Sequence, residues 1–174
     1  MSPRARRALL VLMSLAGLGA ASVVHAQPAP AQDFVNGAAQ SDAYEIAAGE
    51  LALTQSADPE VKRFAQQMIQ DHRKTSADLA QAAAAAGLAP PPPVVGGDQA
   101  RMLSALQSQK GPDLDRSFWT QQVNAHTAAL VTQQDYVAKG TEPHLRALAQ
   151  AAAPLIQRHL EMARRAAAAA PPAP

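Results

Sequence analysis

Apolar positions recur at steps of three and four residues over most of the chain, which is the spacing of an amphipathic helix. Ala, Leu, Gln and Glu dominate these segments and runs of β-branched residues are few, so the composition also favours helix. The pattern predicts four main helices, at about residues 33–56, 59–86, 113–139 and 143–169. A shorter helix is expected at about residues 98–109.

Turn and capping residues define the predicted ends of the second helix. Asp58 suits the N-cap, and Pro59 suits the first helical position. Gly87 ends this helix, and the prolines at residues 90–93 prevent it from continuing. In the last helix, Pro154 is expected either to kink a continuous helix or to divide it into two shorter ones.

The lengths of the connections predict the topology. The first and second main helices are joined by a tight turn, as are the third and fourth, so each pair should pack as antiparallel neighbours. About 26 residues, including the short helix, separate the second and third main helices, which is long enough to cross a bundle. The predicted fold is all-α, a ferritin-like four-helix bundle with one long crossover. The alternative is a plain up-down-up-down bundle with the short helix packed across one end.

The N-terminus has the features of a signal peptide. Basic residues precede an apolar run at about residues 8–24, and small residues end at Ala26, so cleavage is expected after Ala26. A signal peptide of this kind would direct the protein to the periplasm. The alternative is an N-terminal membrane anchor, because roughly 17 apolar residues approach the lower limit for a membrane span.

Composition limits the chemistry and the partners. The chain of 174 residues lacks cysteine, which excludes disulfides and thiolate ligands. Its formal net charge of +1 would become −2 without the three arginines of the signal peptide, and no dense basic patch remains, so nucleic acid is not an expected partner. A protein partner or a homo-oligomer is left open. The expected segments are a signal peptide at 1–26, a flexible N-terminus at 27–32, the bundle at 33–169 and a disordered Ala/Pro tail at 170–174.

Three histidines occupy inward positions on three different predicted helices. His72, His126 and His159 each interrupt an apolar stripe, and Glu45 is placed on the inward face of the first helix. Glu45, His72 and His126 lie roughly 18–20 Å along their helices at 1.5 Å per residue, and His159 is also near the middle of its helix. All four side chains are therefore expected at mid-height in the bundle.

This arrangement is interpreted as a site for a single transition-metal ion with Glu45, His72, His126 and His159 as ligands. Neutral imidazole and carboxylate suit Zn, Fe, Cu or Ni, and this set of ligands does not choose among them. Asp71 is expected to accept a hydrogen bond from one of the histidines. The alternative is a metal-free cluster in which the buried histidines bond to one another, to Glu45 or to nearby glutamines.

Known enzyme signatures are missing from the sequence. Di-iron bundles need Glu-x-x-His motifs on two helices, and Glu142 and His144 have the wrong spacing. There is no phosphate-binding loop and no nucleophile elbow, so no catalytic residue is assigned. The sequence favours a non-enzymatic protein of the envelope, acting in metal handling or envelope stress. Its competitors are a metal-free structural or interaction module and a redox enzyme with a degenerate di-iron site.

Several segments, at residues 33–35, 44–46, 59–72, 122–126 and 154–163, resemble the bacterial domain-of-unknown-function family 4142. The most specific stretch is Phe-Ala-x-x-Met-x-x-Asp-His, which ends at His72. The resemblance spans about residues 33–165 and implies a ferritin-like four-helix bundle in exported proteins, which are often labelled outer-membrane proteins. It implies no established activity or cofactor. It places five residues at positions of the family pattern: Glu45, Asp71, His72, His126 and His159.

Overall fold

The computed structural model describes residues 29–89 and 94–169, and the regular structure in these ranges is entirely α-helical, as predicted. The predicted signal peptide at residues 1–26 and the predicted tail at residues 170–174 lie outside the described residues. The helices are α1 (Ala29–Gln55), α2 (Pro59–Ala85), α3 (Gly97–Gln107), α4 (Gly111–Lys139) and α5 (Pro143–Ala169).

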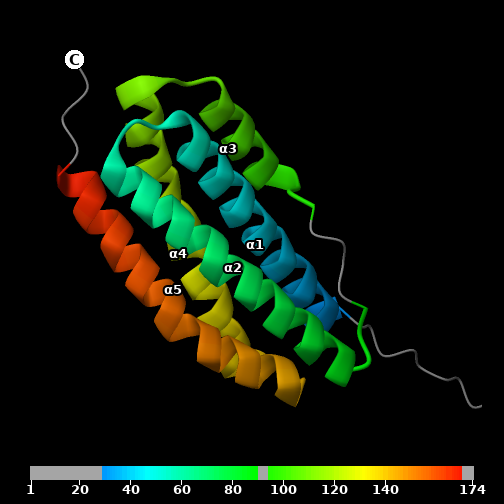
Figure 1. The fold of residues 1–174 in the computed structure, drawn as a ribbon. Coiled ribbons are helices and arrows are strands. Elements are labelled where there is room, and N and C mark those ends of the chain that lie inside the picture. Colours follow the sequence, from blue (N-terminus) through cyan, green and yellow to red (C-terminus); the bar gives the residue numbers. More distant parts are fainter. Residues whose placement is uncertain (1–28, 90–93, 170–174) are drawn as a thin grey trace, which may run out of the picture.

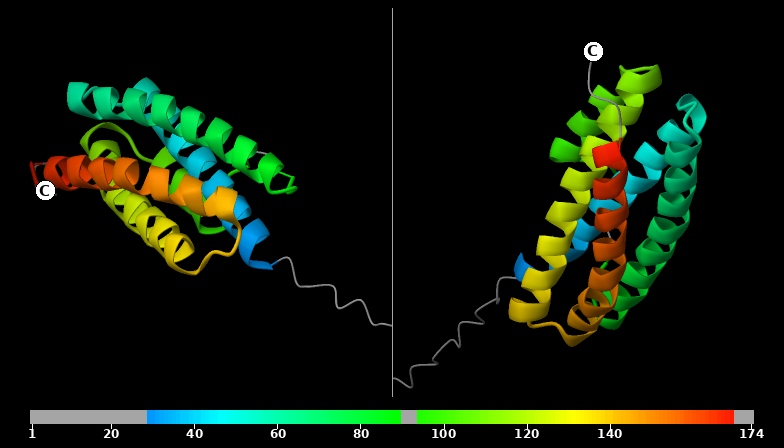
Figure 2. Two further views of the ribbon diagram at one scale, coloured as in Figure 1. Left: turned by 90° about the horizontal axis from the view of Figure 1, so that it is seen from below. Right: turned by 90° about the vertical axis from the view of Figure 1, so that its left-hand side faces the viewer.

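Four of the helices form the predicted bundle (Figures 1 and 2). The pairs α1–α2 and α4–α5 are antiparallel and joined by tight turns, and the bundle closes through contacts of α1 with α4 and of α2 with α5. The connection from α2 to α4 contains α3 and crosses the length of the bundle, so α2 and α4 run in the same direction. The parallel direction of α2 and α4 confirms the ferritin-like topology and contradicts the up-down-up-down alternative.

The ends of α2 follow the predicted capping chemistry. The Asp58 carboxylate accepts hydrogen bonds from the backbone N–H groups of Glu60, at 2.7 Å, and Val61, at 3.4 Å, and Pro59 occupies the first turn. After the last turn, Gly87 adopts a φ of 71°, a left-handed conformation that favours glycine. This turn directs the chain away from the helix axis and into the crossover.

Helix α1 is longer than predicted, and α5 decides between the two alternatives given for Pro154. Helix α1 begins at Ala29, four residues before the predicted start, so residues 29–32 extend the helix. In this first turn, the amide of Gln32 donates a hydrogen bond of 2.9 Å to the side-chain oxygen of Asn36. Helix α5 is continuous through Pro154, so it is not divided into two shorter helices.

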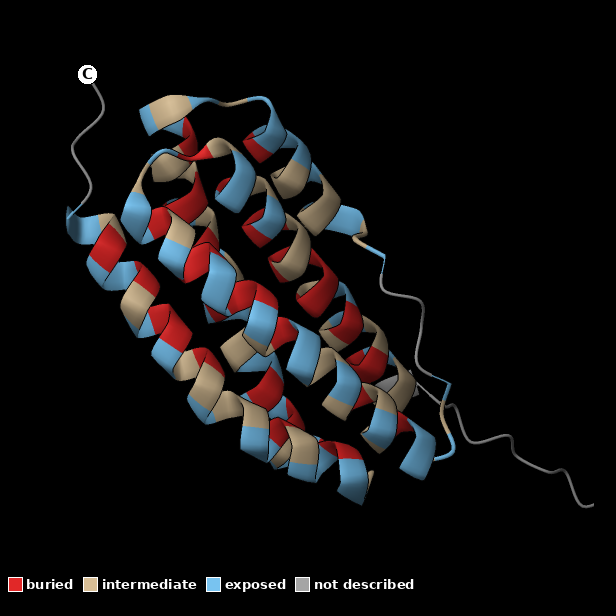
Figure 3. Ribbon diagram, in the orientation of Figure 1, coloured by how far each residue is buried: buried red, intermediate tan, exposed pale blue. Residues whose placement is uncertain are grey.

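The core consists of two apolar clusters separated by a layer of buried polar residues. Figure 3 shows where buried residues lie along the helices. The larger cluster contains Phe64, Met68, Phe118 and Trp119, and α3 contributes Leu106 to it. The second cluster, towards the other end of the bundle, includes a stacked aromatic pair, Phe34 and Tyr136, with ring centroids 4.0 Å apart. Along α2, α4 and α5, the buried histidines lie between residues of these two clusters.

None of the helices within residues 29–89 and 94–169 is both long and apolar enough to cross a bilayer.

Candidate metal centre

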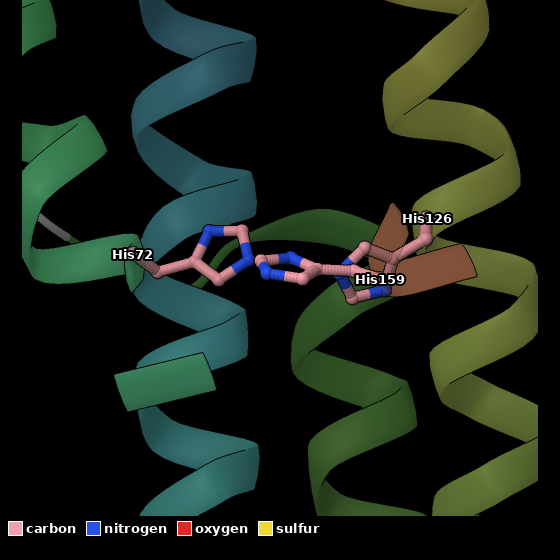
Figure 4. A group of neighbouring side chains, drawn as sticks. All are labelled: His72, His126 and His159. Atoms are coloured by element: carbon pink, nitrogen blue, oxygen red, sulfur yellow. The ribbon is translucent and has the colours of Figure 1, made fainter. Parts of the chain in front are cut away.

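Three imidazoles meet in the polar layer at the middle of the bundle (Figure 4). His72 reaches inward from α2, His126 from α4 and His159 from α5, and each residue is at most 4% exposed. One ring nitrogen from each histidine lies within 4.8 Å of those from the other two. The ring centroids are 5.3–5.7 Å apart. The expectation that these three histidines share one height is therefore met by the geometry.

The ring of His72 is oriented by a carboxylate of α1. Its Nδ1 lies 2.8 Å from Oδ1 of Asp42, which is itself buried. The hydroxyl groups of Thr75 and Ser76 also donate to Asp42, at 2.8 and 3.2 Å, so three groups of α2 hold this carboxylate in place. Because a carboxylate only accepts hydrogen bonds, Nδ1 of His72 carries the hydrogen and donates it.

His126 is oriented by the backbone of its own helix. Its Nδ1 donates to the carbonyl oxygen of Gln122, 2.9 Å away and one turn earlier. The side chain of Gln122 donates from Nε2 to Oε2 of the buried Glu45 at 2.7 Å. The other carboxylate oxygen of Glu45 lies 3.7 Å from Nδ1 of His126. Glu45 therefore faces the nitrogen of His126 that already has a partner, and it is not a member of the group of three converging side chains.

The ring of His159 is oriented by a carboxylate of α2. Its Nε2 lies 2.9 Å from Oδ2 of Asp71, a half-buried residue that directly precedes His72. Asp71 thus occupies the predicted position of an acceptor beside a histidine. The opposite nitrogens of the three rings are buried and have no hydrogen-bond partner among the described residues: Nε2 of His72, Nε2 of His126 and Nδ1 of His159.

Burial and neighbouring charges give the three histidines different proton affinities. Burial by itself lowers the pKa of His72, but the hydrogen bond to Asp42 and the nearby carboxylates outweigh it, so the pKa lies above its ordinary value. Burial dominates at His126 and lowers its pKa. Burial, together with the adjacent His126 and His72, lowers the pKa of His159 to about 4. At neutral pH, His126 and His159 are therefore neutral imidazoles with a lone pair on one nitrogen.

The sequence did not identify every residue that supports the cluster. Asp42 was missed, although it precedes Glu45 by three residues in an Ala-rich helix and therefore lies on the same helical face. That spacing of two carboxylates was the signal that could have identified it. Gln122 is one of the nearby glutamines that the sequence offered as partners for a buried histidine, and its carbonyl holds His126. His144, in the first turn of α5, is exposed and lies outside the cluster.

The fold and the cluster define a class of protein, a crossover four-helix bundle with a buried triad of histidines. The chain belongs to the family described as a domain of unknown function, DUF4142, whose model matches residues 19–166. Comparison with curated proteins found no match, and neither did comparison with solved structures.

Proposed function

We propose that this protein is an exported bundle that binds one first-row transition-metal ion and serves in metal handling in the bacterial cell envelope. The ligands are Nε2 of His72, Nε2 of His126 and Nδ1 of His159. One observation carries the proposal: each of three neighbouring rings has one buried nitrogen without a partner among the described residues. Burying three polar atoms in this way is costly unless something binds them.

The hydrogen bonds on the far side of each ring support this assignment. A histidine that binds a metal commonly donates its other N–H to a carboxylate or a carbonyl, which fixes the tautomer and increases the basicity of the ligating nitrogen. Asp42, Gln122 and Asp71 provide such acceptors for the three rings. In its neutral form, each ring therefore presents a lone pair rather than a hydrogen at the nitrogen that is left free.

The local charge also favours a cation. Asp42 and Glu45 are buried, Asp71 is half-buried, and within the described residues no Lys or Arg forms an ion pair with any of them. A divalent ion would offset these negative charges in a medium of low dielectric constant, where charge interactions are strong. We assign Glu45 to this electrostatic role, acting through Gln122 and His126, rather than to the role of a fourth ligand.

The dimensions and the chemistry of the cluster suit a metal ion. Zinc–nitrogen bonds are about 2.0–2.1 Å long, so two nitrogens on one ion are at most about 4 Å apart. Three nitrogens on one ion lie about 3.3–3.6 Å from one another, so ring movements of about 1 Å would bring ring nitrogens that now lie within 4.8 Å of one another to that separation. Three imidazoles suit Zn, Cu, Ni or Fe. Because Glu-x-x-His motifs are missing from the sequence, a di-iron centre is not proposed.

Elemental analysis of the protein purified without a histidine tag tests the proposal. Wild-type protein is expected to contain about one equivalent of a transition metal, and His72→Ala should contain far less. His144→Ala is the matched control, because His144 is exposed and outside the cluster. Equal metal content in wild type and His72→Ala, or similar losses in both variants, would overturn the assignment. Export is tested separately by cell fractionation and N-terminal sequencing, with a mature chain beginning at Gln27 as the expected result.

A further inference from the structure

A cavity of about 350 Å³ lies beside the metal centre and is lined by residues of all five helices. This volume falls within the range of sites for small molecules, roughly 300–1,000 Å³. Two of its lining residues, Asp42 and His72, belong to the hydrogen-bonded cluster described above. Of the three histidines, only His72 lines the cavity, which therefore lies beside the histidine cluster.

Short side chains on facing helices create this space. Gly37 and Ala38 line it from α1, and Ala125, Ala128 and Ala129 line it from α4. Even a Cβ atom added at Gly37 would meet nothing within 4 Å. Larger side chains at these positions would fill the cavity, as they do in the two apolar clusters of the core. Most of the wall is apolar, so it suits the body of an organic molecule.

The polar groups in the wall favour hydrogen-bond donors and positive charge. Asp42 contributes a buried carboxylate, and Oε1 of Gln133, a residue that is 7% exposed, is buried and has no partner among the described residues. Asp98 also lines the cavity, but its carboxylate is exposed and paired with Arg101, so Asp42 is the buried negative charge of the wall. None of the described residues in the wall is Lys or Arg. An anionic molecule would thus be repelled by Asp42 and would leave the Gln133 oxygen unsatisfied.

We propose that this cavity binds a small organic amine, with the ammonium group donating to the acceptors of Asp42 and Gln133 and the apolar body lying against the alanine-rich wall. An ammonium group has three N–H donors and no acceptor, which matches this lining. Its charge complements Asp42, and hydrogen bonds between charged partners are the stronger kind. This binding does not require the metal ion, so it stands or falls independently of the function proposed above.

Calorimetric titration of the protein at neutral pH in the presence of EDTA tests the inference. The probes are 2-phenylethylamine, 2-phenylethanol and phenylacetate, which share an aromatic body and differ in charge. The amine should bind with a dissociation constant on the order of 1 mM or tighter, as expected for a ligand of this size. It should bind at least about tenfold more tightly than phenylacetate, with the neutral alcohol between them.

Paired variants locate the binding. Ala129→Leu fills the cavity and should weaken amine binding at least about tenfold, whereas Ala138→Leu, at an exposed position of the same helix, should not. Gln133→Met removes the unpaired acceptor and should weaken amine binding at least about fivefold. Gln134→Met, at an exposed position next to it, should leave amine binding unchanged. If circular dichroism shows that Ala129→Leu is unfolded, Ala152→Leu fills the same cavity from α5.

Three results would overturn the amine assignment. The first is no heat of binding for the amine at concentrations well above 1 mM. The second is phenylacetate binding as tightly as the amine. The third is equal affinity of the amine for the folded cavity-filling variant and for Ala138→Leu. Because the titrations are made without metal, each of these results leaves the test of the histidine cluster unaffected.

Discussion

Asp42 of α1 and His72 of α2 are joined by a buried hydrogen bond of 2.8 Å between the carboxylate Oδ1 and the ring Nδ1. The bond commits Nδ1 to Asp42 and leaves Nε2 of His72 without a partner among the described residues. Thr75 and Ser76 hold the same carboxylate from α2. The packing of α1 against α2 is thus connected directly to the orientation of one proposed metal ligand.

Replacing this carboxylate should weaken metal binding without unfolding the protein. In Asp42→Asn the side chain keeps one acceptor oxygen but loses the charge that increases the basicity of His72. Loss of such a partner typically reduces metal affinity 10–100-fold, and we expect about tenfold here because an acceptor remains. Calorimetric titration with Zn²⁺ measures the change.

Asp135→Asn serves as the control for the charge removed. Asp135 is exposed on α4 and pairs with Lys139 at 3.1 Å, away from the histidines. Its substitution should leave the zinc affinity unchanged. Equal affinities for Asp42→Asn and wild type would show that the carboxylate does not act on the metal ligand.

Protein freed of metal by chelation should lose stability as the pH falls from about 6.5 to about 4. In the folded state, the pKa of His159 is lowered from 6.5 to about 4, so in this interval the unfolded chain binds a proton that the folded chain does not. The free energy of unfolding therefore falls as the pH decreases. For His159 the loss is about 2 kcal/mol near pH 4.5. His126, with its lowered pKa, acts in the same direction.

His72 contributes in a different pH range. Its folded pKa is raised, so its contribution to stability is fully present below the unfolded pKa and is lost as the pH rises through the folded value. Below about pH 6.5 this contribution is constant, whereas between about pH 7.5 and 6.5 it grows as the pH falls and partly offsets the loss in the wild-type protein. His72 is present in both proteins compared below, so its effect cancels in their difference. Urea unfolding near pH 4.5 and near pH 7.5 should show a smaller difference for His159→Gln than for wild type, by about 2 kcal/mol. An identical difference in both proteins would contradict the lowered pKa of His159.

The meeting of the three histidines was predictable because helix geometry converts sequence position into height. His72, His126 and His159 each lie near the middle of a helix, and the rise of about 1.5 Å per residue brings them to one level in any bundle with short turns between its antiparallel pairs. Their positions in apolar stripes also indicated burial, and each residue is at most 4% exposed. The crossover was also predictable, because the connection between α2 and α4 is long enough to cross the bundle.

The partners of these rings could not be predicted from spacing alone. Helix α1 is rich in alanine, so its apolar pattern leaves the rotation of the helix about its axis poorly defined. Glu45 was therefore assigned as a ligand, whereas the structure places it beside Nδ1 of His126 and Gln122. Asp42 was overlooked for the same reason. The cavity depends on small side chains of α1 and α4 facing each other, which a single sequence does not reveal.

Binding of Zn²⁺ should stabilise the folded protein. At a free zinc concentration 100 times the dissociation constant, the gain is about 2.7 kcal/mol, which corresponds to a rise of roughly 5–10 °C in the thermal midpoint for a domain of this size. His126→Ala should show little or no rise, and His144→Ala should respond like wild type. Calorimetric scans with and without zinc measure these shifts. A wild-type midpoint unmoved by Zn²⁺, Cu²⁺ and Ni²⁺ would support a metal-free histidine cluster instead.

Two glycines of α1 should respond in opposite directions to the same substitution. A Cβ atom at Gly49 would lie 2.9 Å from Cγ1 of Ile69 and 3.0 Å from the carbonyl oxygen of Ala65, so α1 and α2 pack closely at this glycine. Gly49→Ala should therefore destabilise the protein by about 1 kcal/mol, because the overpacking outweighs the gain in helix propensity. Gly37→Ala meets nothing within 4 Å and should stabilise it by about 0.5–1 kcal/mol. Urea unfolding of the two variants measures both changes, and a stabilised Gly49→Ala would show that the two helices separate at little cost.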